Sequence, residues 1–227
     1  MAEELGEKGR QGVAARAERS DSIRNREKLT AAAQAVFAAE GLNAPMDRIA
    51  ATAGVGPGTL YRHFPSRLKL WEAVLEEPLR GQLAVARNAL ANPDRWEGLA
   101  EYIVASCEIE AERDGYLNLM NTRFDGAPGL QAIRAEIQRT VRRLVTLARD
   151  EGAVRPDFTM EDLLFIAVSN SKIAEVTRST APGAWRRNVE LFLDAIRPER
   201  AHPLSQRPLT PSQVARSMVR QESLTRP

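Results

Sequence analysis

Apolar side chains recur at a helical spacing along almost the whole chain. Between residues 22 and 40 they stand at positions i, i+3, i+4, i+7 and i+8, which places them on one face of a helix. These residues are Leu29, Ala32, Ala33, Val36 and Phe37. Gly41 follows the helix directly, at a position where a glycine commonly ends one. No segment alternates convincingly between apolar and polar residues as a strand does, so the pattern predicts an all-α fold.

The same reading predicts helices along the rest of the chain. They cover residues 46–53, residues 57–64, a long segment that begins after residue 66, residues 94 to about 113, 130–150, 159 to about 180, and 184–197. Asp94 with Glu97, and Thr159 with Asp162, have the spacing of a capping box, in which two side chains satisfy the free backbone groups at a helix start.

Proline positions and composition predict how this helical region ends. Pro78 lies inside the long helix that begins after residue 66, where it is expected to bend or break the helix. Beyond Pro198 the chain is rich in Pro, Ser, Arg and Gln and poor in apolar residues, which predicts a flexible tail over residues 198–227. Residues 1–21 are predicted to form a flexible basic arm before the first helix.

The net charge of +2 conceals an uneven distribution. Residues 8–69 contain eleven basic and five acidic side chains, a net charge of +6, and the remaining residues carry −4. A basic segment joined to an acidic one fits a module that binds a polyanion, attached to a body that binds something else. A solvated, charged surface would give the same numbers, so charge alone leaves both interpretations open.

Few residues are available for catalysis or metal binding. Cys107 is the only cysteine, which excludes a disulfide framework, and His63 and His202 are the only histidines. We therefore expect no enzyme activity, no catalytic residues, no metal site and no cofactor. No apolar run reaches the roughly 20 residues of a membrane helix, and the first residues, MAEELGEKGR, contain no apolar core of the kind a signal peptide has. We expect no membrane partner and a cytoplasmic location.

The stretch GVGPGTLYRHF, residues 54–64, carries the most specific signal. Its glycines suggest a phosphate-binding loop, but neither phosphate-loop spacing is present and a helix precedes the stretch. A tight turn between two short helices fits better. A helix-turn-helix requires a small residue where the two helices meet, a residue in a left-handed conformation at the turn, and an apolar residue that holds the second helix inward. In this sequence these residues are Ala50, Gly54 and Leu60, respectively. The second helix then presents a face without bulk that suits a DNA major groove.

The sequence AAAQAVFAAEGLNAPMDRIAATAGVGPGTLYRHFPSRLKLWEAV is similar to the DNA-binding domain of the tetracycline-repressor (TetR) family of bacterial transcriptional regulators. The resemblance implies a three-helix DNA-binding domain over residues 22–67, followed by a helical effector-binding and dimerisation domain over residues 68–197. The chain departs from the family at Gly56, where serine is common, and at Leu68, where an acidic residue is common.

Carried over residue by residue, the resemblance implies which side chains contact DNA. Tyr61 resembles the family tyrosine that packs on the sugar-phosphate backbone, and Arg67 the basic residue that reaches a phosphate. Arg62 is our candidate for reading guanine, because a guanidinium can bond O6 and N7 together. Tyr61 as a packing residue remains the alternative. The full predicted set is Arg48, Pro57, Gly58, Thr59, Tyr61, Arg62, His63 and Arg67.

The helical body is predicted to form a homodimer and to bind an effector. The segment 161–176 is apolar nearly all round and needs cover on both sides, and in the family the last two helices form a four-helix bundle with a partner subunit. The predicted interface residues are Leu164, Val168, Trp185, Val189, Phe192 and Ile196. The resemblance also implies an effector pocket, for which the candidates are Trp71, Tyr102, Ser106, Cys107, Met120, Arg123, Phe124, Phe165 and Asn170.

These observations favour a ligand-responsive repressor that binds a palindromic, double-stranded DNA operator as a dimer and is released by a small molecule. In this mechanism the ligand shifts the long fourth helix and so changes the separation of the two recognition helices. Two alternatives remain open: a helical regulator controlled by a protein partner, and an activator with no small-molecule effector.

Overall fold

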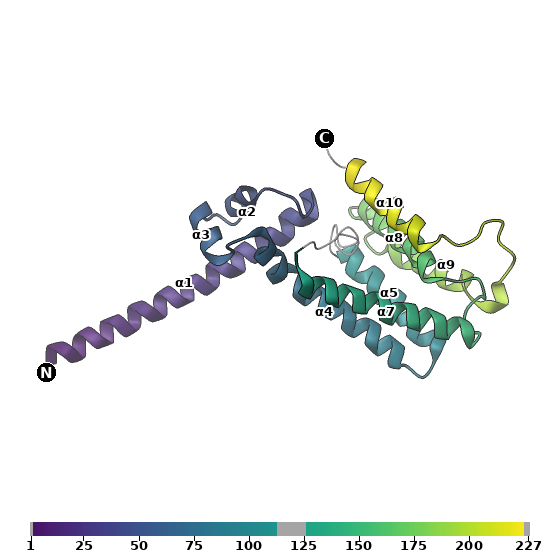
Figure 1. The fold of residues 1–227 in the computed structure, drawn as a ribbon, viewed down its shortest axis with the longest axis horizontal. Helices are drawn as coiled ribbons and strands as arrows, with labels where there is room; N and C mark the ends of the chain where they lie inside the picture. The colour runs from purple at the N-terminus through teal and green to yellow at the C-terminus, as the bar shows by residue number, and fades with distance from the viewer. Residues whose placement is uncertain (1, 113–125, 225–227) are drawn as a thin grey trace. The chain divides into compact units, whose positions relative to one another are not determined.

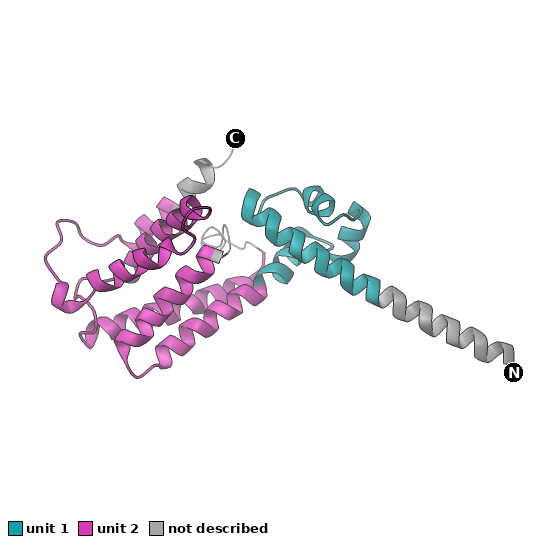
Figure 2. Ribbon diagram, turned by 180° about the vertical axis from the view of Figure 1, so that it is seen from behind, with its two compact units in different colours: residues 1–75 teal, residues 76–227 magenta. Residues whose placement is uncertain are grey.

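The computed structural model describes residues 2–112 and 126–224, with side chains over residues 20–111 and 126–217. The described chain is helical and contains no strand (Figure 1). It divides into two compact units, residues 1–75 and 76–227, which are coloured separately in Figure 2. The predicted all-α fold is therefore confirmed.

The first unit consists of α1 (Ala2–Glu40), α2 (Met46–Thr52), α3 (Pro57–His63) and the start of α4 (Arg67–Ala91). All five apolar residues predicted to share one face of the first helix are buried, together with Ile49, Leu60, Phe64 and Leu70 from the other three helices. The apolar stripe of α1 thus forms the centre of a small core that holds α2 and α3.

Helix α1 is longer at its N-terminus than the sequence predicted. It begins at Ala2, whereas the prediction was a flexible arm over residues 1–21 and a helix from residue 22. Residues 2–21 contain no proline and are rich in Ala, Glu and Arg, which are strong helix formers, and these outweigh the unfavourable Gly6, Gly9 and Gly12. The arm is helical in the structure, and its flexibility stays a prediction.

Helix α4 continues through Pro78 without a break, and the boundary between the two units falls within it, after Leu75. Ser66 caps the start of α4, since its Oγ accepts a hydrogen bond from the Lys69 N–H at 3.3 Å. Of the expectation that Pro78 would bend or break the helix, the break is wrong, and a bend stays a prediction. The proline removes one backbone donor, but the surrounding apolar residues Val74, Leu75 and Leu79 are buried and hold the helix together by packing.

The second unit contains the remainder of α4 together with α5 (Arg95–Glu112), α7 (Pro128–Asp150), η1 (Met160–Asp162), α8 (Leu163–Thr177), α9 (Ala184–Ala195), η2 (Pro198–Arg200) and α10 (Pro211–Leu224). Helix α5 packs against α7, α8 and α9, and so lies at the centre of the bundle. The predicted stripe of α7 is buried at Ile133, Ile137, Val141, Leu144 and Ala148.

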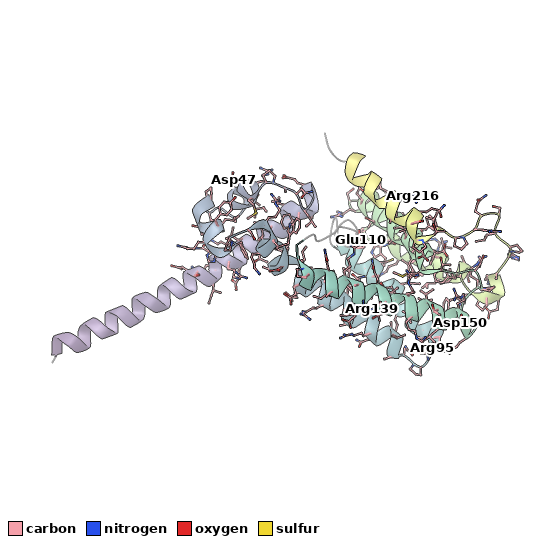
Figure 3. All side chains as sticks on the ribbon, in the orientation of Figure 1. Asp47, Arg95, Glu110, Arg139, Asp150 and Arg216 are labelled. Carbon is pink, nitrogen blue, oxygen red and sulfur yellow. The ribbon has the colours of Figure 1, made fainter. Side chains whose placement is uncertain are left out.

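Hydrogen bonds at the helix starts explain why α5 and η1 begin where they do. Thr159 and Asp162 form the predicted capping box, with the Thr159 N–H donating to the Asp162 carboxylate at 2.8 Å. Asp94 accepts the Glu97 N–H at 2.9 Å. The adjacent Arg95 forms an ion pair with Glu151 at 3.0 Å. Arg95 and Asp150 lie at the same end of the bundle in Figure 3.

The C-terminal segment, residues 198–227, contains regular secondary structure. It contains η2 and α10, and Thr210 starts α10 with a capping box: the Thr210 N–H donates to the Gln213 side chain at 2.8 Å, and the Gln213 N–H donates to the Thr210 hydroxyl at 3.3 Å. Arg155 Nη2 donates to the His202 carbonyl at 2.8 Å and ties the segment to the bundle. The segment predicted to be a flexible tail thus contains the helical elements η2 and α10, and its flexibility stays a prediction.

Candidate DNA-binding site

The turn between α2 and α3 has the backbone geometry that the sequence predicted. Gly54 has a φ of +67°, a left-handed conformation that side-chain-bearing residues rarely adopt. The Gly54 N–H donates to the Ala51 carbonyl at 3.1 Å and the Val55 N–H to the Ala50 carbonyl at 3.0 Å. This pair of bonds is a Schellman motif, which ends α2 and turns the chain into α3.

Helix α3 is fixed by two inward residues and a proline start. Gly56 is the N-cap and Pro57 occupies the first turn, where its missing N–H costs nothing. Leu60 and Phe64 are buried in the core of the first unit. The opposite side of α3 carries Tyr61, which is 47% exposed, and Arg62, which is exposed. The structure therefore presents a short helix whose outer side is polar and accessible.

The first turn of α3 carries no large side chain on its exposed side. Pro57 and Gly58 are exposed and Thr59 is half-buried. A Cβ atom built on Gly56 or Gly58 would meet no atom of the protein within 4 Å, and neither glycine has a positive φ. The fold itself thus does not require glycine at residue 58. A close approach by another molecule gives this position a reason to be small.

Arg48 lies on the exposed side of α2, next to Asp47, which is labelled in Figure 3. The Arg48 guanidinium is ion-paired with Glu40 at the end of α1, with Nε 3.0 Å from the carboxylate oxygen. The pair is exposed, so it contributes little stability and is easily exchanged for another anion. Contact between Arg48 and DNA stays a prediction.

Arg67 has a second role that the sequence did not predict. Its Nη1 donates to the carbonyl oxygens of Leu42 at 3.0 Å and Ala44 at 2.5 Å, and so holds the loop between α1 and α2. Trp71 Nε1 donates to the same Leu42 carbonyl at 3.2 Å. Arg67 was predicted to reach a phosphate, but in the structure one of its nitrogens is committed to the fold. Contact with DNA through its remaining donors stays a prediction.

His63 ends α3 and has an unusual environment. Its Nε2 is buried without a hydrogen-bond partner among the described residues. Partial burial, followed by the neighbouring charges of Arg62 and Arg26, lowers the pKa of His63 below its ordinary value. The lowered pKa favours the neutral ring, which argues against His63 as a cationic phosphate contact.

Arg26 is a residue that sequence reasoning missed. Its guanidinium carbon lies 4.6 Å from the centre of the Phe64 ring, and its Nη1 donates to the His63 carbonyl at 3.5 Å. Arg26 therefore connects α1 to the C-terminal end of α3, where a cation is favourable. Arg26 lies in a long polar stretch of the sequence, which does not indicate a contact with α3. The contact with Phe64 and His63 arises only because α1 passes close to the end of α3.

The part of the chain that the structure describes offers neither a metal site nor a membrane-spanning helix as an alternative. No group of three or more His, Cys, Asp or Glu side chains could hold a metal ion. No helix in the described part of the chain has the length and apolar character needed to span a membrane.

Both units of the chain contain regions that match known protein families. Residues 29–74 match the bacterial regulatory proteins of the tetR family, and residues 96–198 match the C-terminal domain of SbtR-like transcriptional regulators. The chain belongs to the TetR family. As a member, it is a transcription regulator with a DNA-binding helix-turn-helix, and it is not an enzyme.

Individual relatives of this TetR-family chain cover different parts of it. The chain is 34% identical over 134 residues to the HTH-type transcriptional activator FasR of Mycolicibacterium smegmatis, covering 58% of this chain and 61% of FasR. It is 42% identical over 62 residues to the HTH-type transcriptional regulator SAB2452 of Staphylococcus aureus, covering 27% of this chain and 34% of that protein. The matched regions thus span less than two thirds of these relatives.

A solved structure shows the same fold over most of the chain. The ketosteroid transcriptional regulator KstR2 of Mycobacterium tuberculosis aligns with a TM-score of 0.56 and 22% identity, covering 76% of this chain and 94% of KstR2. At this identity the likeness concerns the fold alone.

The TetR-family body places the predicted effector residues in different surroundings. Tyr102, Cys107 and Asn170 are buried in the second unit, and Ser106 is half-buried. Phe165, by contrast, is 53% exposed on α8, and Trp71 lies in the first unit. Met120, Arg123 and Phe124 lie outside the described residues. The predicted set is therefore not a single group, and its buried members come from α5 and α8.

Asn170 is the polar residue with the most unusual contacts in this TetR-family body. It is fully buried, and its Nδ2 donates to the Cys107 carbonyl at 3.3 Å, which fixes the orientation of the amide. Its Oδ1 has no hydrogen-bond partner among the described residues. Leaving such an atom unpaired costs on the order of 1–3 kcal/mol, so a donor at this position would be favourable.

Burial also governs the two titratable neighbours on α5. Burial raises the pKa of the Tyr102 phenol, and hydrogen bonds with Ser106 and Gln82 oppose that rise in part. Burial, with the Glu110 carboxylate as a second cause, raises the pKa of the Cys107 thiol to about 12. Cys107 is therefore a neutral, unreactive thiol at ordinary pH.

The predicted dimer residues fall into two groups. Leu164, Val168 and Phe192 line an open hollow of about 710 Å³ on the surface of α8 and α9. The other three, Trp185, Val189 and Ile196, are buried within the same chain. Apolar periodicity cannot separate these groups, because it does not distinguish the residues that the chain's own core covers from those that stay at its surface.

Proposed function

We propose that this TetR-family chain is a ligand-responsive repressor that binds a palindromic operator as a homodimer and is released by a small molecule. The observation that carries the DNA-binding part is the outer side of α3, where exposed Tyr61 and Arg62 follow an open, side-chain-free start at Gly58. A helix of this form enters a major groove by its N-terminal end.

The proposed contacts follow from the position of each side chain. Arg62 bonds O6 and N7 of a guanine, and Tyr61 packs on the sugar-phosphate backbone beside it. Thr59 and His63 add contacts at the edges of α3, and Arg48 exchanges its exposed Glu40 partner for a phosphate. Pro57 and Gly58 contribute by allowing the backbone to approach DNA closely.

The DNA-contacting surface of one chain is small, and we therefore propose that the protein binds DNA as a dimer. Each chain presents one α3, and one short helix binds DNA weakly, whereas two copies read half-sites one helical turn apart. The apolar surface of α8 and α9, which includes Leu164, Val168 and Phe192, is the proposed contact between the copies.

Ligand response is proposed to act through α5, α8 and α4. The buried Asn170 amide, with its unpaired Oδ1, supplies a polar anchor next to Cys107 on α5. Helix α4 belongs to both units, so a ligand that shifts it in the second unit changes the first. Ligand and operator then oppose each other by thermodynamic linkage.

The test is a binding titration on the promoter beside the protein's own gene. We expect Arg62→Ala to weaken operator binding by about 1–3 kcal/mol and to relax the preference at one base pair. Arg80→Ala is the control, because Arg80 is also an exposed arginine but lies on the part of α4 in the second unit. Equal weakening of all DNA sequences by Arg62→Ala would make Arg62 a phosphate contact only.

The effector part is tested by repeating the titration with candidate small molecules. Compounds that lower operator affinity of the wild type should lose this effect in Asn170→Leu, which keeps the side-chain size and removes the polar anchor. A compound that binds without changing operator affinity would contradict the proposed linkage.

An activator is the second candidate, because the relative FasR is named an activator. The two functions share the same operator contact and differ in its consequence. Deleting the gene should raise transcription from its target promoter if the protein represses, and lower it if the protein activates.

A further inference from the structure

A hollow of about 330 Å³ in the second unit lies along α7. It is bounded by the C-terminal half of α7, by η1 and by residues 209–211 at the start of α10, and we refer to it as the α7 hollow. Neither Asn170 nor Cys107, at the proposed effector site, lines it. The two sites therefore use different side chains.

The α7 hollow has an apolar wall that three elements build together. Val145 comes from α7, Met160 from η1, and Leu209 and Pro211 from the C-terminal segment. Val145 is buried, and Met160 and Leu209 are half-buried. An apolar group placed in the hollow would lose water on contact with these side chains, which is favourable.

Two arginines of α7 bring positive charge to the same hollow. Arg142 and Arg149 both line it, and their spacing of i, i+7 places them on one side of the helix. Glu161 also lines the hollow and is ion-paired with Arg142 at 3.5 Å. The partner of Arg149 is the adjacent Asp150, whose side chain is 58% exposed, so this pair is easily exchanged for another anion.

The two arginines belong to a basic run that DNA binding by α3 does not use. Residues 139–149 contain four arginines and no acidic residue. Arg139, Arg142 and Arg143 are exposed at positions i, i+3 and i+4, a spacing at which like charges on a helix repel each other. Figure 3 labels Arg139 on α7. An anion bound beside this run would reduce the repulsion.

The threonines at the hollow are already occupied as donors. The Thr159 hydroxyl donates to the Asp162 carboxylate at 2.9 Å, and the Thr210 hydroxyl donates to the Gln213 side chain at 2.9 Å. Hydrogen bonds to an anion therefore come mainly from the guanidinium groups. A guanidinium matches a carboxylate well, because two parallel N–H groups can bond its two oxygens.

We propose that the α7 hollow binds a small amphipathic anion, a carboxylate joined to an apolar group. Arg149 donates to the carboxylate and Arg142 adds charge beside it, while the apolar group packs on Val145, Met160 and Leu209. Because Leu209 belongs to the C-terminal segment, the ligand joins this segment to α7. The site is additional to the proposed effector site and does not depend on it.

The first test is isothermal titration calorimetry of the full chain with hexanoate and with benzoate, which distinguishes an aliphatic from an aromatic acid. Acetate lacks the apolar group and hexanol lacks the charge, so each should bind at least about tenfold more weakly than the better of the two acids. The proposal is wrong if neither acid binds, or if hexanol binds as tightly as hexanoate.

Substitution of the arginine locates the bound acid. Arg149→Gln should raise its dissociation constant by at least about tenfold, and Arg149→Lys, which keeps the charge, by less. Arg139→Gln is the matched control, because it makes the same charge change at an exposed arginine of α7 that does not line the hollow. Equal weakening by Arg139→Gln would show a general attraction of charge and no site at Arg149.

Two further variants separate this site from the proposed effector site. Asn170→Leu should leave the affinity for the acid unchanged, and a loss of binding there would place the acid in the effector site and contradict the inference. Leu209→Ala should raise the dissociation constant at least about threefold through lost apolar contact. Leu204→Ala is its control, since Leu204 lies in the same segment, is 62% exposed and does not line the hollow.

Amide hydrogen exchange of the wild type shows whether the ligand joins the C-terminal segment to α7. Exchange at residues 209–217 should slow when the acid is bound, and Arg149→Gln should remove this protection. Unchanged exchange in this segment, together with unchanged affinity in Leu209→Ala, would show that the acid does not contact the segment and would overturn the inference.

Discussion

A substitution at Gly58 is expected to affect folding and DNA binding in opposite directions. It lies in α3 with an ordinary φ and open space around a built Cβ atom, so alanine fits the folded protein. We expect Gly58→Ala to raise the free energy of unfolding by about 0.5–1 kcal/mol, because alanine loses less backbone entropy in a helix. In the proposed complex the added methyl group stands between α3 and DNA, and operator affinity should fall.

The measurement pairs chemical denaturation with operator titration. Gly81→Ala is the control, because Gly81 is an exposed glycine of α4 with equally open surroundings. It should stabilise the protein by a similar amount and leave operator affinity unchanged. If Gly58→Ala binds the operator as tightly as the wild type, the start of α3 does not approach DNA closely.

His63 gives the second prediction at this scale, a dependence of stability on pH. Because the folded pKa lies below the ordinary value of 6.5, the unfolded chain binds more protons near that pH than the folded chain does. The unfolding free energy should therefore fall as the pH decreases through 6.5 towards the folded pKa. His63→Asn should lose less stability than the wild type between pH 7.5 and 5.5, as followed by urea denaturation. An identical decrease in both proteins would locate the effect elsewhere.

At the scale of single elements, Gly98 shows the opposite case to Gly58. It lies in the first turn of α5 and is buried, and a Cβ atom there would overlap the Ala89 carbonyl oxygen of α4. The obstacle is backbone, which cannot rotate away. We expect Gly98→Ala to destabilise the protein by about 1–3 kcal/mol through forced separation of α4 and α5, although a glycine-to-alanine change in a helix usually stabilises. Thermal unfolding against the Gly81→Ala control measures the difference.

The elements also show what the sequence could predict. The helices α2 and α3 and the turn at Gly54 follow from local patterns of apolar, glycine and proline residues, and the structure has them within a residue or two of the prediction. Helix α10 carried a local signal as well, the Thr210–Gln213 capping box, which the polar composition around it outweighed. The long helix α1 was shortened in the prediction for the same reason, since polar composition was read as an arm.

Other parts of the site depend on tertiary contacts and carried no local signal. Arg67 holds the carbonyls of Leu42 and Ala44, and Arg26 contacts Phe64, only because of how α1, α3 and α4 cross. The same reason explains why the predicted dimer residues were a mixture of core and surface. Periodicity identifies which residues of α9 are apolar, but it does not say which of them the chain's own α5 and α8 cover.

At the scale of the whole molecule, the small net charge understates the charge available for DNA. The +6 of residues 8–69 lies in the part of the chain that contains α2 and α3, so operator binding should weaken strongly with salt as counterions return to the phosphates. Each phosphate contact contributes about 0.9 to the slope of log affinity against log salt concentration. In a dimer, any contact made by one chain is made twice.

Arg48→Ala therefore tests the phosphate contact and the dimer together. Removing Arg48 from both copies should reduce the magnitude of the salt slope by about 1.8 and weaken all DNA sequences about equally. Arg80→Ala is a close control, since the side chains of Arg48 and Arg80 are both 62% exposed and both pair with a glutamate. The salt slope of Arg80→Ala should equal that of the wild type. If Arg48→Ala reduces the magnitude of the salt slope by only about 0.9, a single copy contacts the phosphate. If the slope does not change, Arg48 pairs with Glu40 and does not contact DNA.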